Sequence, residues 1–174
     1  SLVAGAEGLV GDVPLTRPDG IYLPETYFFS YGDTRLLMLS RMEKAMKEAV
    51  LKAWQSRGKN IAISTPGEAI TLASIIERET GADAERARVS AVFHNRLRRR
   101  MRLQSDPTVA YAVTGGVRQL RRRLTRSDLT IQSDYNTYRR EGLPPGPIAN
   151  PGLAALLAAV RPARTRDLYF VANG

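Results

Sequence analysis

The chain has 174 residues, a formal net charge of +9 and an apolar fraction of 43%, which suits one sizeable globular core. It has no cysteine and one histidine, which excludes disulfides, thiol catalysis and multi-histidine metal sites. No run reaches the roughly 20 apolar residues of a membrane span, and no signal-peptide pattern is found. The positive charge favours a polyanionic partner: nucleic acid, anionic lipid or a carboxylate-rich polymer.

The N-terminal segment, residues 1–20, is punctuated by glycine and proline, and we expect loop or short strand there. The motif DGIYLPETYFF at 19–29 follows, and Pro24 within it predicts an edge or irregular segment. Its Glu25 is a polar group in an apolar setting. Glu25 is therefore either the salt-bridged acid of a packed connector or a site residue.

A long amphipathic helix is predicted from Asp33 to about Arg57, and Gly58 should end it. Apolar residues recur there at three- and four-residue steps. The predicted apolar stripe consists of Leu36, Leu39, Met42, Met46, Ala49, Val50 and Ala53.

The central element is an apolar helix predicted over residues 66–80. Thr65 can cap it, Pro66 suits the first helical position, and Glu68 stands where the acid of a capping box belongs. The apolar residues of this segment fall on all sides of the helical wheel. We therefore expect the helix to be buried over most of its circumference.

Two carboxyl groups, Glu77 and Glu79, lie at the end of this helix, and neither has an obviously solvent-facing position. A buried carboxylate is costly unless it is paired or protonated. Desolvation raises the pKa of such a group and can make it a general acid near neutral pH. The alternative is that both acids pair with arginines such as Arg78, Arg86 or Arg88. The pattern alone favours pairing and does not choose between the two glutamates.

The next helix is predicted at about 84–101, with Asp83 as its cap. Its core stripe is formed by Val89, Val92, Phe93 and Leu97. The arginine-rich end, from Arg96 to Arg102, suits the negative end of a helix dipole, and we expect a solvated face there. We also expect His94 to lie on a solvated helix face.

A short helix should follow Asp106 and Pro107 and run to Val113, closed by Gly115. Gln104 then lies on the loop that enters this helix, where ligand contacts are common. Asp106 is either a helix cap or a site residue. The basic segment 117–126 lacks interleaved aromatic residues, and no helix-turn-helix or zinc pattern is present. We expect a mobile basic loop or hairpin and no nucleic-acid partner.

The polar cluster Tyr135, Asn136, Thr137 and Tyr138 joins two aromatic rings to hydrogen-bonding groups. Proteins bind sugars with such residues, because aromatic side chains stack on the apolar faces of sugar rings while polar side chains form hydrogen bonds with the sugar hydroxyls. Asn150 and Pro151 should then start a short buried helix. A strand is predicted from Leu168 to Ala172.

Several ordered motifs resemble the YceG-like family from about Glu7 to the end of the chain. They are LPETY at 23–27, ASIIERET at 73–80, VFHNRL at 92–97, MRLQSDPTVAY at 101–111, YNTYRREGLPPGPIANPG at 135–152 and LYFVANG at 168–174. These family members are endolytic murein transglycosylases of the bacterial envelope. The resemblance implies lytic cleavage between N-acetylmuramic acid and N-acetylglucosamine inside glycan strands, which leaves 1,6-anhydro ends.

The same resemblance implies that Glu77 is the catalytic acid and then base, and that Glu79 has a supporting part. The implied substrate-binding candidates are Gln104, Asp106, Tyr135, Asn136 and Tyr138, with Glu25 as a further candidate. No metal or organic cofactor is required by this chemistry. The implied fold is α+β, a mainly helical, lysozyme-like catalytic domain at 21–174 with a few short strands.

Residues 1–20 would then be the end of an upstream LysM-like region or a linker. The full-length protein is expected to be anchored by a membrane segment absent here. It is expected to act at the extracytoplasmic, periplasmic face of the cytoplasmic membrane. We expect this fragment itself to be soluble. Its expected partners are peptidoglycan glycan strands and cell-wall synthases. The alternative is a non-catalytic scaffold that binds murein or synthesis proteins, in which Glu77 is only a buried paired acid.

Overall fold

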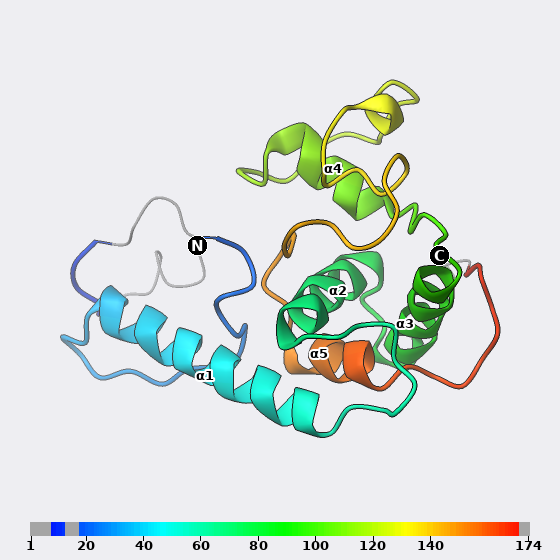
Figure 1. Ribbon diagram of the computed structural model, residues 1–174. Helices are drawn as coiled ribbons and strands as arrows, with labels where there is room; N and C mark the ends of the chain where they lie inside the picture. Colours follow the sequence, from blue (N-terminus) through cyan, green and yellow to red (C-terminus); the bar gives the residue numbers. More distant parts are fainter. Residues whose placement is uncertain (1–7, 13–17, 171–174) are drawn as a thin grey trace.

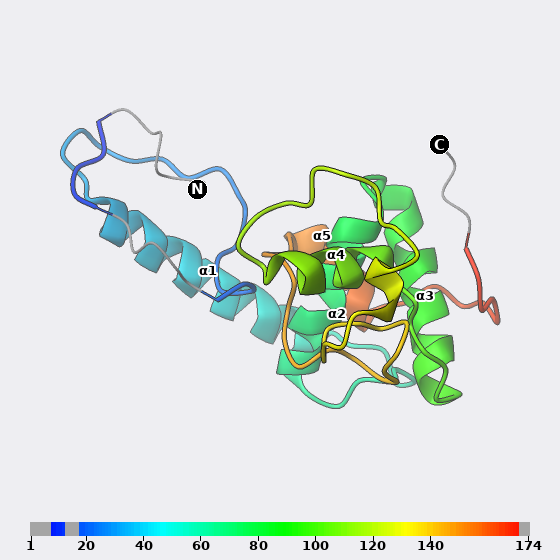
Figure 2. The same ribbon diagram turned by 90° about the horizontal axis from the view of Figure 1, so that it is seen from above.

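The computed structural model describes residues 8–12 and 18–170, and this part of the chain is mostly helical (Figures 1 and 2). The elements are α1 (Arg35–Gln55), α2 (Pro66–Glu79), α3 (Asp83–Arg98), α4 (Asp106–Thr114), the short 3₁₀ helix η1 (Asp128–Thr130) and α5 (Leu153–Val160). Within the described residues, the only β-pairing is one parallel bridge between Val10 and Thr34. The expected short strands are therefore wrong for this part: residues 168–170 form none, and 171–172 lie outside it.

Helix α2 is the central element, as its composition predicts, and it packs against α1, α3, α4 and α5. The side chain of its N-cap, Thr65, accepts a hydrogen bond of 3.1 Å from the Glu68 N–H. The Glu68 carboxylate accepts from the Ser64 N–H, one residue before the expected partner. Leu72, Ile75 and other residues from every side of the helix are buried, so the predicted cap and burial are confirmed.

Helix α1 is two residues shorter at each end than predicted and joins two apolar clusters. Its C-terminal half packs into the main core with α2, α3 and α5. Its N-terminal half, with Met38 and Met42, forms a smaller cluster with Leu9 and Tyr22. In Figure 1 this half of α1 extends away from the other helices. Leu36, predicted in the apolar stripe, is 53% exposed.

Helix α3 corrects two predictions. Its N-cap is Ala82, and Asp83 lies in the first turn, where its carboxylate pairs with Arg86 at 2.9 Å. His94 is fully buried instead of solvated. Its Nδ1 accepts a hydrogen bond of 2.9 Å from the Ala62 N–H, and its Nε2 lies 2.8 Å from the Ala159 carbonyl oxygen. The neutral ring satisfies both backbone groups, so His94 is a structural residue.

The arginine-rich end of α3 is only partly a solvated face. Arg96 is buried and donates to the carbonyl oxygens of Leu103 and Leu168 at 2.8 and 2.7 Å. The residues that follow it, Arg98, Arg99 and Arg100, are exposed as predicted. Arg96 therefore connects the end of α3 to the segment before α4 and to the C-terminal segment.

The predicted N-caps of α4 and α5, Asp106 and Asn150, are both wrong. Each of these side chains forms a tertiary hydrogen bond instead. The N-cap of α4 is Ser105, and Asp106 is the first helical residue. Helix α5 starts at Leu153 with Gly152 as its N-cap. The Asn150 side chain instead accepts a hydrogen bond of 3.0 Å from the Tyr22 N–H.

Candidate active site

A cavity of about 890 Å³ lies beside the C-terminal end of α2. Glu77 and Arg78 of α2 form one wall, and residues of α4 form another. The loop after α4 and residues 148–150 close the remaining sides, and Asp19 lies at one edge. The cavity thus combines charged side chains from segments far apart in sequence, which is typical of binding and active sites.

Glu77 lines this cavity and is anchored by one of its two carboxylate oxygens. Its Oε2 accepts a hydrogen bond of 3.0 Å from the N–H of Gly152, the N-cap of α5, and lies 3.6 Å from Nη1 of Arg86. The side chain is 28% exposed. Among the described residues, Oε1 has no hydrogen-bond partner. One oxygen is therefore fixed by the protein, while the other is available to a ligand.

The pairing alternative predicted that both glutamates pair with arginines, and it is met for Glu77 alone: Glu77 pairs with Arg86, whereas Glu79 forms no ion pair with the described residues. The guanidinium group of Arg86 also contacts Asp83 at 2.9 Å and the Thr80 carbonyl at 3.2 Å. The guanidinium is only 11% exposed, so these contacts hold it in place. A fixed cation and a helix N-terminus both stabilise a carboxylate. Arg86 and the Gly152 N–H therefore place positive charge beside the Glu77 carboxyl group.

Glu79 has a different environment, although it is only two residues away. Its Oε2 accepts a hydrogen bond of 3.0 Å from the Ser105 hydroxyl. The pKa of Glu79 is raised to about 7, chiefly by burial; the Ser105 bond and the positive charge of Arg96 lower it in part, and the negative charge of Asp106 raises it. Glu79 is not among the residues that line the cavity. The carboxyl with the raised pKa is therefore not part of the cavity wall, whereas Glu77 is.

Two tyrosine–aspartate pairs flank the cavity. Tyr138 donates a hydrogen bond of 2.6 Å to Oδ1 of Asp106, and burial together with this bond raises the pKa of Tyr138 to about 12. Tyr111 donates to Asp19, and burial raises the pKa of Asp19 while this bond partly lowers it. Each aspartate in the cavity thus has a hydroxyl partner from the protein.

The other predicted site residues occupy varied positions. Gln104 is exposed at φ +47°, and its N–H donates to the Thr137 carbonyl. The ring of Tyr135 packs against Tyr111, with 4.8 Å between centroids. Asn136 is fully buried, donating to two backbone carbonyls and accepting from the Tyr138 N–H. Glu25 is exposed and forms no ion pair with the described residues. Substrate contact by these residues stays a prediction.

Arginines of the loop after α4 also line the cavity, which was not predicted from the sequence. The segment 117–126 is an irregular loop, and Arg118, Arg122 and Arg123 line the cavity from it. Figure 2 shows the loop as a long arch between α4 and η1. Arg122 forms a bidentate pair with Asp128 of η1 at 2.5 and 2.9 Å. The available signal was the arginine density of the segment, but its contact with the site depends on the tertiary fold.

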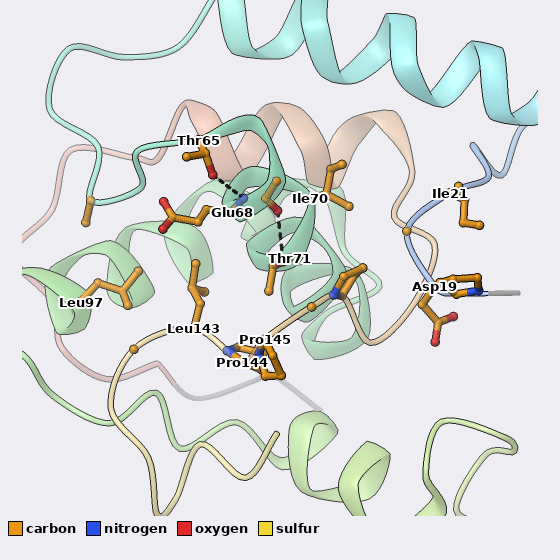
Figure 3. A pocket seen from close by; sticks show the side chains of 17 residues that line it. Asp19, Ile21, Thr65, Glu68, Ile70, Thr71, Leu97, Leu143, Pro144 and Pro145 are labelled. Atoms are coloured by element: carbon orange, nitrogen blue, oxygen red, sulfur yellow. Dashed lines mark hydrogen bonds between the residues drawn. The ribbon is translucent and has the colours of Figure 1, made fainter. Parts of the chain in front are cut away.

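A second cavity of about 740 Å³ lies at the other end of α2 (Figure 3). Its walls include Thr65 and Glu68 of the first turn of α2 and the proline-rich segment 142–147. Asp19 lines both cavities, so they meet at this residue. The neighbouring Gly20 has φ +80°, and a Cβ there would lie 2.5 Å from Cγ of Pro147. Glycine at this position thus permits the close approach of the backbone at residue 20 to Pro147.

The fold and the site define a mostly helical domain whose central helix carries a glutamate into a large, charged cavity. The sequence model of the YceG-like family matches residues 6–174, and the chain belongs to this family. A crystal structure of a YceG-like protein from Listeria monocytogenes aligns with a TM-score of 0.71 and 36% identity. The alignment covers 88% of this chain and 49% of that one.

Two curated relatives are named endolytic murein transglycosylase. The one from Bacillus subtilis (strain 168) is 38% identical over 155 residues, which is 89% of this chain and 42% of the relative. The one from Streptococcus pneumoniae serotype 2 (strain D39 / NCTC 7466) is 31% identical over 163 residues, 90% of this chain and 28% of the relative. The chain therefore spans less than half the length of either relative.

Proposed function

We propose that this chain is the catalytic part of an endolytic murein transglycosylase with Glu77 as its acid and base. The observation that carries the proposal is that Glu77, fixed by Arg86 and the Gly152 N–H, faces a large open cavity. The names of the Bacillus and Streptococcus relatives support the reaction class. The substrate is the glycan strand of peptidoglycan.

The proposed reaction needs one carboxyl group and no water. Protonated Glu77 donates its proton to the glycosidic oxygen as the bond from C1 of N-acetylmuramic acid to that oxygen breaks. The resulting carboxylate takes the proton of the C6 hydroxyl of the same sugar, whose oxygen forms a new bond to C1. Arg86 and the Gly152 N–H stabilise the carboxylate between these steps. A two-carboxylate glycosidase instead uses water or a second carboxylate as nucleophile.

The two adjoining cavities support cleavage inside a strand, because a chain cut internally must continue on both sides of the acid. Both cavities are lined by Asp19, and we propose that the strand runs from one cavity to the other past this residue. We place Asp106 and Tyr138 in contact with the sugars beside Glu77, with Gln104 and Tyr135 as further contacts. This use of a helix-borne glutamate beside a groove is the lysozyme-like part of the proposal.

The setting of the whole protein follows from the same proposal. It acts at the periplasmic face of the cytoplasmic membrane, is anchored there by a segment outside this chain, and works with cell-wall synthases. Residues 1–20 belong to the upstream region and 21–174 to the catalytic domain. For the described part of the chain, no helix has the length and apolar character to span a bilayer.

The test is mass spectrometry of purified glycan strands after incubation with the parent chain, Glu77→Gln and Glu79→Gln. We expect 1,6-anhydro ends at internal positions with the parent, loss of at least about 100-fold with Glu77→Gln, and retained cleavage with Glu79→Gln. Reducing ends would show a hydrolase and contradict the lytic reaction. Abolition by Glu79→Gln alone, in a folded variant, would transfer the acid role to Glu79.

A second candidate is the non-catalytic scaffold, and the ion pair between Glu77 and Arg86 is the observation that favours it. A paired carboxylate is a common structural feature. Under this hypothesis the parent binds glycan strands without cleaving them, and Glu77→Gln changes neither result. The same incubation, combined with a sedimentation assay for binding to murein sacculi, separates the two functions.

A further inference from the structure

We propose that Arg118 and Arg123 form a binding site for the carboxylate groups of murein peptide stems, inside the cavity that holds Glu77. The proposal rests on the proposed function and assigns the charged part of its substrate. Both arginines line the cavity from the loop after α4. Murein strands carry a neutral sugar backbone and anionic peptide stems, so a site for the stems requires cations beside the sugar groove.

The acids of the cavity already have partners within the protein. Asp106 accepts from Tyr138, Asp19 accepts from Tyr111, and Glu77 contacts Arg86. These contacts leave no acidic group of the cavity wall committed to the loop arginines. The positive charge of the loop arginines that line the cavity is therefore not neutralised by these acids.

The three loop arginines that line the cavity differ in whether they have an acidic partner within the protein. Arg122 is committed to Asp128 through its bidentate pair, which ties the loop to η1. Arg118 and Arg123 are exposed and form no ion pair with any described residue. Arginine binds carboxylates through its planar fork of donors. The loop thus presents two uncommitted arginines, with Arg122 as a support between them.

Arg121 provides a matched control because it lies in the same loop and is exposed but is not among the residues lining this cavity. Substituting Arg121 or Arg118 changes the net charge of the chain equally. A loss of strand binding that is caused by lower net charge should therefore be the same for these variants. A loss that is caused by removal of the binding site should be found only when Arg118 or Arg123 is substituted.

The experiment measures binding and cleavage of two glycan-strand preparations. One carries intact peptide stems, and in the other the carboxylates have been converted to carboxamides, which removes charge and keeps the stem. The proteins are the parent, the three single variants Arg118→Gln, Arg123→Gln and Arg121→Gln, which have the same net charge, and the double variant Arg118→Gln with Arg123→Gln. Binding is followed by fluorescence anisotropy of labelled strands at low and high salt, and cleavage by the appearance of 1,6-anhydro ends.

We expect the parent to bind intact stems about four- to 25-fold more tightly than amidated stems at low salt, because each of the two exposed arginine–carboxylate pairs contributes roughly two- to fivefold. Arg118→Gln and Arg123→Gln should each lose part of this preference and the double variant all of it, whereas Arg121→Gln should keep it, and high salt should reduce it. Equal binding of the two preparations by the parent overturns the proposal. So does a loss of preference in Arg121→Gln equal to that in Arg118→Gln and Arg123→Gln.

Three further outcomes separate this site from other possibilities. Charge-dependent binding without 1,6-anhydro ends would refute the proposed catalysis and leave the arginine site supported, whereas cleavage indifferent to stem charge would refute the arginine site alone. If the double variant loses binding to phosphatidylglycerol vesicles and keeps its preference for intact stems, the loop contacts membrane and the proposal is overturned.

Discussion

Glu79→Gln tests whether the buried glutamate at the end of α2 is neutral in the folded chain. Burial raises the pKa of Glu79 from its ordinary value of 4.5 to about 7. Glutamine has nearly the same shape and cannot ionise, and its side-chain oxygen can still accept the hydrogen bond from Ser105. The substitution therefore removes the ionisation and little else.

The sign and size of the effect follow from linkage between proton binding and folding. Because the folded-state pKa of Glu79 is the higher one, its contribution to stability is fully present below pH 4.5 and is lost as pH rises through about 7. A difference of one in pKa corresponds to about 1.4 kcal/mol, so the loss is on the order of 3 kcal/mol. Near pH 4.5 the parent and Glu79→Gln should be similarly stable. Near pH 8.5 the variant should be more stable by about that amount.

The assay is urea unfolding followed by circular dichroism from pH 4.5 to 8.5, with the same chemical change at exposed Glu48 of α1 as the control. The measured quantity is the difference in free energy of unfolding between each variant and the parent. A difference that stays flat with pH for Glu79→Gln would refute the neutral buried carboxyl. A difference that rises equally in Glu48→Gln would assign the effect to overall charge.

Three further substitutions test the structural and site assignments. His94→Leu should lower the free energy of unfolding by about 2–5 kcal/mol in urea titrations, because two backbone groups lose their partner; a change below 1 kcal/mol would contradict the buried role. Asn136→Ala should cost about 2–4 kcal/mol and leave the cleavage rate per folded molecule intact, as two carbonyls lose a donor. Tyr138→Phe should change stability by less than about 1 kcal/mol, since Asp106 is exposed to water, and should raise the KM for glycan strands; an unchanged KM would remove Tyr138 from the groove.

The features predicted correctly from the sequence are those set by local interactions. The cap of α2 joins Thr65 to a residue three positions away, and the helix is apolar on every side, so its burial follows from composition. The helical character of α1, α3 and α4 likewise follows from periodicity and from the glycine at the end of α4. Such signals are complete within a few residues of sequence.

The missed features depend on partners far away in the chain. His94 looks like a surface residue beside arginines, yet its two partners are 32 and 65 residues away. Asn150 has the residue type of a helix cap, but a backbone N–H 128 residues away binds its side chain. Side chains with two possible partners are assigned by the tertiary fold, and sequence periodicity carries no information about that choice.

The two glutamates of α2 illustrate how one helix end can separate two chemical roles. A spacing of two residues turns side chains by about 200°, so Glu77 and Glu79 face nearly opposite sides of the helix. Glu77 meets a cation and a helix N-terminus at the cavity wall, whereas Glu79 meets a neutral hydroxyl in a buried position. At pH below its pKa of about 7, Glu79 is mainly protonated and adds little negative charge beside Asp106 or beside the carboxylate that Glu77 becomes in the proposed reaction. The half-buried position of Glu79 beside a hydroxyl therefore complements the position of Glu77 beside a cation.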